Sequence, residues 1–155
     1  MVAPRTMPGY KAHIAGALVL TGAAIAGTSW LEIYRPGAET MLGLGLLALL
    51  GGLFPDVDTD SKGRRLFYGA AVLADAILMI RQHYRQAAIL GFCALLPAVD
   101  AHRGWTHTWW AALLVPCPIL LVPVFLLHQP WPPLAPYYLA GVLGYFSHLI
   151  LDRTF

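Results

Sequence analysis

Histidine and aspartate residues recur in this sequence at spacings that could hold a divalent metal ion. The stretch SHLILD places His148 and Asp152 four residues apart on a helical run, so both side chains project from one face, one turn apart. An imidazole and a carboxylate in this arrangement can bind one cation together, or the carboxylate can orient the imidazole. A hydrogen bond at a helix end, level with the lipid headgroups, is the simpler alternative for this pair.

A second stretch, FPDVDTDS, carries carboxylates at alternate positions, Asp56, Asp58 and Asp60. Alternating carboxylates in a loop suit a hard or borderline cation. A calcium EF-hand is excluded, because its sixth and twelfth positions would be Ser61 and Phe67 instead of glycine and glutamate. A solvated acidic loop is the alternative that requires no metal.

The third stretch, HRGWTH, offers two imidazoles, His102 and His107, on either side of Gly104. The glycine allows the backbone to turn, so both rings could converge on one ion. Arg103 adds a planar cation suited to bidentate binding of phosphate or carboxylate. The alternative is a basic loop that anchors a helix at the membrane interface.

The composition indicates the environment of these residues. The chain has 155 residues, of which 58% are hydrophobic and only 12% are charged, whereas soluble domains carry about 25% charged residues. We therefore expect an integral membrane protein. The basic residues are scattered and form no patch typical of nucleic-acid binding, so no nucleic-acid partner is expected. Cys93 and Cys117 lie in apolar runs without metal-type spacing, which favours small buried thiols.

Hydropathy predicts an all-α, polytopic membrane helix bundle that forms a single domain over residues 1–155. The expected membrane segments are residues 12–30, 40–54, 66–80, 86–100, 109–127 and 134–152. A spanning helix needs about 20 residues, so the first, fifth and sixth segments are long enough. The other three are shorter, and we expect them to be tilted, extended into their loops or partly re-entrant. Four or five full spans are the alternative to six.

The distribution of basic residues favours both termini inside. With six spans, seven basic residues fall on the inner side and three on the outer side. The same topology collects most of the potential metal ligands at the inner face. These are His13, Asp56, Asp58, Asp60, Asp100, His102, His107, His148 and Asp152. His83 and His128 fall on the opposite face, and Asp75 lies inside the third segment, where we expect a structural hydrogen bond or a pairing with Arg81 or Arg85.

Three ordered motifs, FPDVD, HRGWTHT and GYFSHLILD, together with His13 at the first helix, resemble the YdjM-like family of bacterial inner-membrane metal-dependent hydrolases. The resemblance covers nearly the whole chain and departs at Thr108, where the family usually has serine. It implies a multi-pass protein of the bacterial inner membrane with a bound divalent metal. Carried over residue by residue, it points to His13, Asp56, Asp58, His102, Arg103, His107, His148 and Asp152. A looser similarity to zinc-dependent phospholipase C, at the level of the fold, favours phosphoester chemistry.

These observations predict metal-assisted hydrolysis at the cytoplasmic face, with a phosphoester of a lipid or another amphiphile as substrate. His and Asp ligands suit Zn²⁺ first, then Mn²⁺ or Fe²⁺, and the number of candidate groups allows one or two ions. The metal would activate a water molecule, Asp58 or Asp152 would act as general base, and Arg103 would hold the phosphate. The alternatives are a non-catalytic protein that binds or transports metal, and a small assembly or scaffold subunit. A transporter would carry ionisable groups near mid-membrane, where only Asp75 lies.

Overall fold

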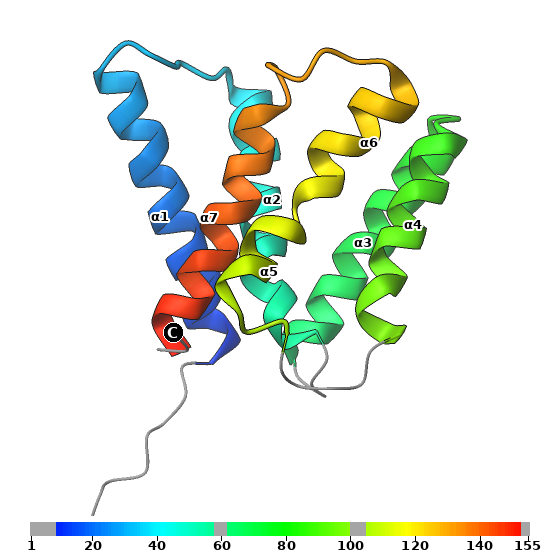
Figure 1. Cartoon of the computed structure of the whole chain (residues 1–155), viewed down its shortest axis with the longest axis horizontal. Coiled ribbons are helices and arrows are strands. Elements are labelled where there is room, and N and C mark those ends of the chain that lie inside the picture. The colour runs from blue at the N-terminus through cyan, green and yellow to red at the C-terminus, as the bar shows by residue number, and fades with distance from the viewer. Residues whose placement is uncertain (1–8, 58–61, 100–104, 153–155) are drawn as a thin grey trace, which may run out of the picture.

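The chain folds into a bundle of helices (Figure 1). The computed structural model describes residues 9–57, 62–99 and 105–152, and over these ranges it contains helices and no strand. The α-helices are α1 (Tyr10–Trp30), α2 (Ala38–Leu53), α3 (Lys62–Ile80), α4 (Tyr84–Val99), α5 (Trp109–Leu114), α6 (Cys117–Leu127) and α7 (Ala135–Asp152). A short 3-10 helix, η1 (Phe54–Asp56), continues α2. The predicted all-α class is therefore confirmed.

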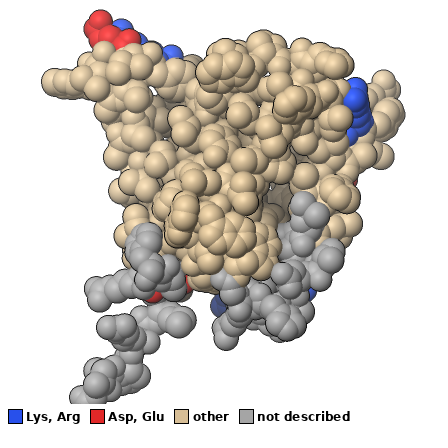
Figure 2. Space-filling view, viewed as in Figure 1, with Lys and Arg blue, Asp and Glu red and all other residues tan. Residues whose placement is uncertain are grey.

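The surface of the bundle is apolar along most of its length. Within the described residues, three helical stretches are long and apolar enough to cross a membrane: Tyr10–Trp30, Ala38–Asp56 and Trp109–Leu127. Large hydrophobic side chains on these helices point outward, such as Val19 with 72% of its surface exposed and Leu42 with 76%. Figure 2 shows the consequence on one face, where a broad uncharged belt separates charged atoms at the two ends. A lipid environment is the one in which this surface is stable.

Two expected segments differ from the sequence prediction in whether they qualify as membrane spans. The second segment, expected over residues 40–54, begins at Ala38, and η1 extends it to Asp56. It is therefore long enough to count among the three stretches that could cross a membrane. The sixth, expected over residues 134–152, forms α7 but is not among the three stretches that length and composition qualify. Its inward face carries polar groups, including the buried Ser147 and His148, which reduce its apolar character.

The fifth expected segment, residues 109–127, is not one continuous helix. It divides into α5 and α6 at Val115 and Pro116. Neither Pro116 nor Pro118 has a backbone N–H, so two helical hydrogen bonds are lost within one turn, and the proline rings crowd the preceding turn. Because of this break, α5 and α6 run in different directions. Both lie between α7 and the α3–α4 hairpin (Figure 1).

Helix α7 lies at the centre of the bundle and packs tightly against α1 and α2. Small residues make this approach possible, because helix backbones come close only where side chains are absent. A Cβ atom added to Gly144 would overlap the backbone of Ala48, and one added to Gly52 would lie 2.9 Å from the Cβ of Ala17. This packing aligns the end of α7 with the end of α2 and the beginning of α1.

Candidate metal centre

Four chain segments meet at the lower end of the bundle in Figure 1. They are the first turns of α1, the η1 turn after α2, residues 105–108 before α5, and the last turns of α7. Each contributes at least one histidine or aspartate: His13, Asp56, His107, and the pair His148 and Asp152. Helix packing therefore brings together residues from three sequence motifs and the N-terminal helix.

His148 is the most buried member of this cluster, and its ring is fixed on one side. Its Nδ1 atom lies 2.8 Å from the carbonyl oxygen of Gly52. A carbonyl oxygen can only accept, so we assign the Nδ1 proton to this hydrogen bond. The opposite nitrogen, Nε2, then presents a lone pair. It lies 3.2 Å from Asp152 Oδ2 and 3.7 Å from Asp56 Oδ1.

Asp152 bridges the histidines. Its Oδ1 atom lies 3.3 Å from His13 Nε2, and its Oδ2 atom faces His148 and, at 3.9 Å, His107 Nε2. The rings of His13 and His148 stack with their centroids 3.8 Å apart and an angle of 20° between their planes. The buried His13 and His148 rings form the inner side of the cluster. The Asp56 and His107 side chains each keep 24% of their surface exposed. The cluster is therefore open to water on one side.

Backbone contacts hold the segment that carries His107. The buried Tyr145 hydroxyl, one turn before His148 on α7, donates a hydrogen bond to the carbonyl oxygen of Thr106 at 2.6 Å. The Thr108 hydroxyl donates to the Trp105 carbonyl oxygen at 2.5 Å. The Thr106 hydroxyl lies 3.2 Å from His107 Nδ1, which leaves Nε2 directed towards Asp152. These contacts determine where the His107 ring is placed.

The donor set fits a divalent cation. One ligand atom from each of Asp56, His107, His148 and Asp152 can be chosen so that all four lie within 4.8 Å of one another. In the described part of the chain, His148 Nε2 and Asp152 Oδ1 are buried without a hydrogen-bond partner. Buried polar atoms without partners are costly, and a lone pair facing carboxylate oxygens is repulsive. A cation beside His148 Nε2 would give that atom a partner and relieve the repulsion from Asp152 Oδ2 and Asp56 Oδ1, and the two carboxylates would balance its charge.

Five of the eight residues singled out in the sequence are brought together: His13, Asp56, His107, His148 and Asp152. Asp58, His102 and Arg103 lie outside the described residues, as do Asp60 and Asp100.

Two residues that the sequence did not single out, Gly52 and Tyr145, position the cluster through a backbone carbonyl and a hydroxyl group. The signals for Tyr145 were its place one turn before His148 and within the motif GYFSHLILD. Asp75 is not part of the cluster. Its Oδ1 atom is buried and has no hydrogen-bond partner in the described ranges, which show no ion pair with Arg81 or Arg85.

The fold and the cluster together define an all-helical membrane protein with a potential metal-binding centre at one end of its bundle. The chain belongs to the family described as YdjM inner membrane protein, whose model matches residues 7–154. This confirms membership of the YdjM family, which the three sequence motifs indicated, and supports a membrane location. The match does not extend to hydrolase activity or to the similarity with zinc-dependent phospholipase C. No curated protein and no solved structure matches the chain.

Proposed function

We propose that this protein binds a divalent transition-metal ion in the His/Asp cluster and hydrolyses a phosphoester of an amphiphilic substrate. The observation that carries the proposal is the setting of His148. Its Nδ1 side is held by Gly52, and its Nε2 side faces two carboxylates and a second imidazole within 4.8 Å. Nitrogen and oxygen ligands without thiolate favour Zn²⁺, with Mn²⁺ or Fe²⁺ as the alternatives.

The roles of individual residues follow from their burial and partners. Asp56, His107, His148 and Asp152 would hold the ion, and His13 would orient Asp152 through its Oδ1 atom. A bound divalent ion supplies Lewis acidity and makes water acidic enough to act as a nucleophile near neutral pH. The partly exposed Asp56 and His107 leave a path for water and substrate on the open side.

The other roles proposed from the sequence concern proton transfer and phosphate binding. Because Asp152 is assigned here as a ligand, the other carboxylate proposed from the sequence, Asp58, would accept the proton from the attacking water. Arg103 would bind the phosphate oxygens in a bidentate manner and stabilise developing negative charge. Trp105, two residues after Arg103 in the sequence, belongs to the segment that carries His107.

The bundle end that carries the cluster supports an amphiphilic substrate at the cytoplasmic face. Lys11, Lys62, Arg64 and Arg65 lie in the first turns of α1 and α3, at the same end as the cluster. Basic residues accumulate on the cytoplasmic side of inner-membrane proteins. A site at the end of an apolar bundle lies at headgroup depth, where the phosphate of a lipid lies as well.

Elemental mass spectrometry of the detergent-purified protein tests the metal half of the proposal. We expect one or two transition-metal ions per chain in the wild type, and loss of the ion in His148→Ala and in His102→Ala. His128→Ala is the matched control, because His128 is exposed at the end of α6. A folded wild type without metal, or a His148→Ala variant with full occupancy, would refute the assignment.

Turnover assays test the hydrolase half. Release of the phosphorylated headgroup from phospholipid vesicles, and hydrolysis of a short soluble phosphodiester, should require the metal and be lost in His148→Ala. A protein that keeps its metal and hydrolyses neither ester would refute the hydrolase proposal and support a non-catalytic metal-binding role.

A further inference from the structure

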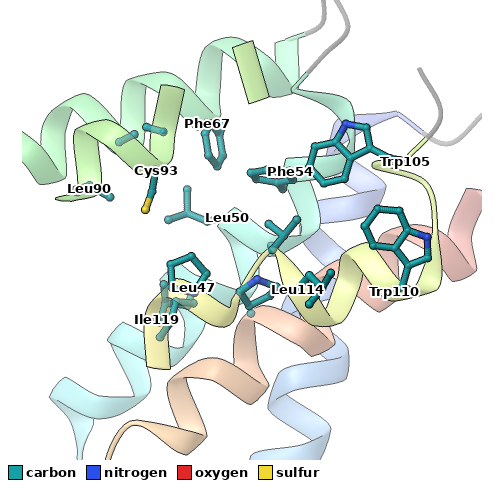
Figure 3. Close-up of a pocket in the computed structure, with 17 residues that line it drawn as sticks. Leu47, Leu50, Phe54, Phe67, Leu90, Cys93, Trp105, Trp110, Leu114 and Ile119 are labelled. Carbon is teal, nitrogen blue, oxygen red and sulfur yellow. The ribbon is translucent and has the colours of Figure 1, made fainter. Parts of the chain in front are cut away.

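An apolar cavity lies between the helices of the bundle (Figure 3). Its volume is about 350 Å³, and its walls come from α2, α3, α4, α5, α6 and α7. Figure 3 shows side chains that line it, including Leu47, Leu50, Phe67, Leu90, Cys93 and Ile119. No charged residue is among those that line it. Packed protein interiors contain few voids larger than a water molecule, whereas ligand pockets range from about 300 to 1,000 Å³.

The cavity continues towards the outer surface of the bundle. Within the described residues, α4 packs mainly against α3 and α6 packs mainly against α7, which leaves the seam between α4 and α6 weakly closed. A second hollow of about 510 Å³ follows this seam and shares Cys93 and Pro118 with the cavity. Its rim includes Phe92 and Leu121, which are 65% and 46% exposed. Apart from Arg85 in the first turn of α4, the residues that line this hollow are apolar, so in a bilayer most of the opening faces hydrocarbon chains.

The inner end of the cavity is built from the segments that carry the candidate ligands. Phe54 and Trp105 both line it, and each stands two residues before a ligand, Asp56 and His107 respectively. Phe54 also packs against Tyr145, with ring centroids 5.9 Å apart, and Tyr145 holds the Thr106 carbonyl. A molecule with a hydrocarbon tail in the cavity would therefore have its polar end close to the cluster.

We propose that this cavity binds an acyl chain of a phospholipid and thereby places the phosphate at the His/Asp cluster. The catalytic part of this inference rests on the proposed hydrolase function, but occupancy of the cavity does not. The lining is aliphatic and aromatic, the open seam faces the bilayer, and phospholipid acyl chains are what surrounds that seam in the membrane. Burial of each methylene group contributes to binding without any polar contact.

Photo-crosslinking of the full chain tests occupancy directly. The protein is reconstituted in lipid nanodiscs that contain a trace of phosphatidylcholine with a diazirine at the middle of one acyl chain. After irradiation, the modified residues are identified by peptide mass spectrometry. We expect adducts on the cavity-lining Leu50, Leu90 and Ile119 in addition to the outward faces of the helices. Adducts restricted to outward residues such as Val72 and Phe92 would overturn the proposal.

Cavity-filling variants provide the matched comparison. Ala71 is buried in α3 and lines the cavity, whereas Ala76 on the same helix is exposed and does not. Ala71→Phe should abolish the inward adducts and leave the outward ones, and Ala76→Phe should change neither. Ala94→Phe fills the cavity from α4 and serves if Ala71→Phe does not fold. Inward adducts that persist in a folded filling variant would contradict the inference.

Metal content and turnover measured in parallel separate this inference from the proposed function. Inward adducts on a protein without metal would support the acyl-chain site and refute the hydrolase. Metal binding and turnover of a short soluble phosphodiester, without inward adducts, would refute the acyl-chain site alone. When both proposals hold, Ala71→Phe raises the KM for a long-chain phospholipid and leaves the KM for the short ester unchanged.

Discussion

The Nδ1 atom of His148 lies 2.8 Å from the carbonyl oxygen of Gly52, a residue 96 positions earlier in the chain. This contact joins α7 to the last turns of α2, where the absence of a side chain at Gly52 allows α1 and α7 to approach. The close packing of small residues that forms the bundle therefore also fixes the tautomer of the central histidine. A hydrogen bond from the ring nitrogen that does not bind the metal raises the basicity of a ligating imidazole and holds its orientation.

Asp152→Asn should strongly weaken metal binding. The amide keeps the shape of the carboxylate but removes the charge that faces His13, His148 and His107. Loss of an outer contact to a metal ligand typically costs about 10- to 100-fold in affinity, and loss of a ligand should cost more. Competition with a fluorescent zinc chelator measures the affinity.

Glu39→Gln is the control for Asp152→Asn. Glu39 is an exposed carboxylate in the first turn of α2, at the opposite end of the helix from Asp56. Its neutralisation should leave zinc affinity unchanged. Equal affinities for wild type and Asp152→Asn would show that Asp152 is not a ligand.

His13→Phe distinguishes a chemical role of His13 from simple packing. Phenylalanine keeps a planar ring that can stack on His148, at the 3.8 Å centroid distance now observed, but it has no nitrogen to face Asp152. We expect zinc affinity to fall by about 10- to 100-fold, with little change in thermal stability. His83→Phe, at an exposed position beyond α3, is the matched control. If His13→Phe binds zinc as wild type does, His13 only packs.

The sequence predicted the class of fold because the signal for it is local. Apolar runs and the scarcity of charge indicate membrane helices whatever their partners are. The bounds were less accurate where backbone chemistry decides them. Pro116 and Pro118 divide the fifth segment, and η1 extends the second to Asp56, although both prolines and the FPD turn were visible in the sequence.

The candidate site could be predicted in part. His148 and Asp152 share one face of one helix, so their proximity follows from helix periodicity, and the others were grouped by which membrane side they should occupy. The sequence could not show that His13 stacks on His148, or that Gly52 and Tyr145 hold the cluster. These contacts depend on helix crossings between distant segments. The contacts of Asp58, His102 and Arg103 lie outside the described residues.

Gly144→Ala should destabilise the protein, because the added methyl group would overlap the backbone of Ala48. Overpacking of this kind costs about 1–3 kcal/mol of unfolding free energy and sometimes more. Gly22→Ala, in the interior of α1 with nothing within 4 Å of its added Cβ, is the matched control. It should be neutral or stabilising, because alanine favours helix over glycine by about 0.5–1 kcal/mol. Thermal unfolding in detergent measures both, and equal midpoints would contradict the close approach of α2 and α7.

Tyr145→Phe should weaken both stability and metal binding. The substitution removes the hydroxyl that donates to the Thr106 carbonyl and leaves that carbonyl without its buried donor. An unsatisfied buried acceptor costs about 1–3 kcal/mol, and release of the 105–108 segment should lower zinc affinity about tenfold, at the low end of the range for outer contacts. Tyr138→Phe is the matched control, since Tyr138 is also on α7 and donates to a backbone carbonyl, that of Leu113, at 3.1 Å in an exposed position away from the cluster. Thermal unfolding and zinc titration of the two variants should differ in both quantities. A Tyr145→Phe protein that loses stability yet binds zinc with wild-type affinity would show that this hydrogen bond supports the fold and does not position His107.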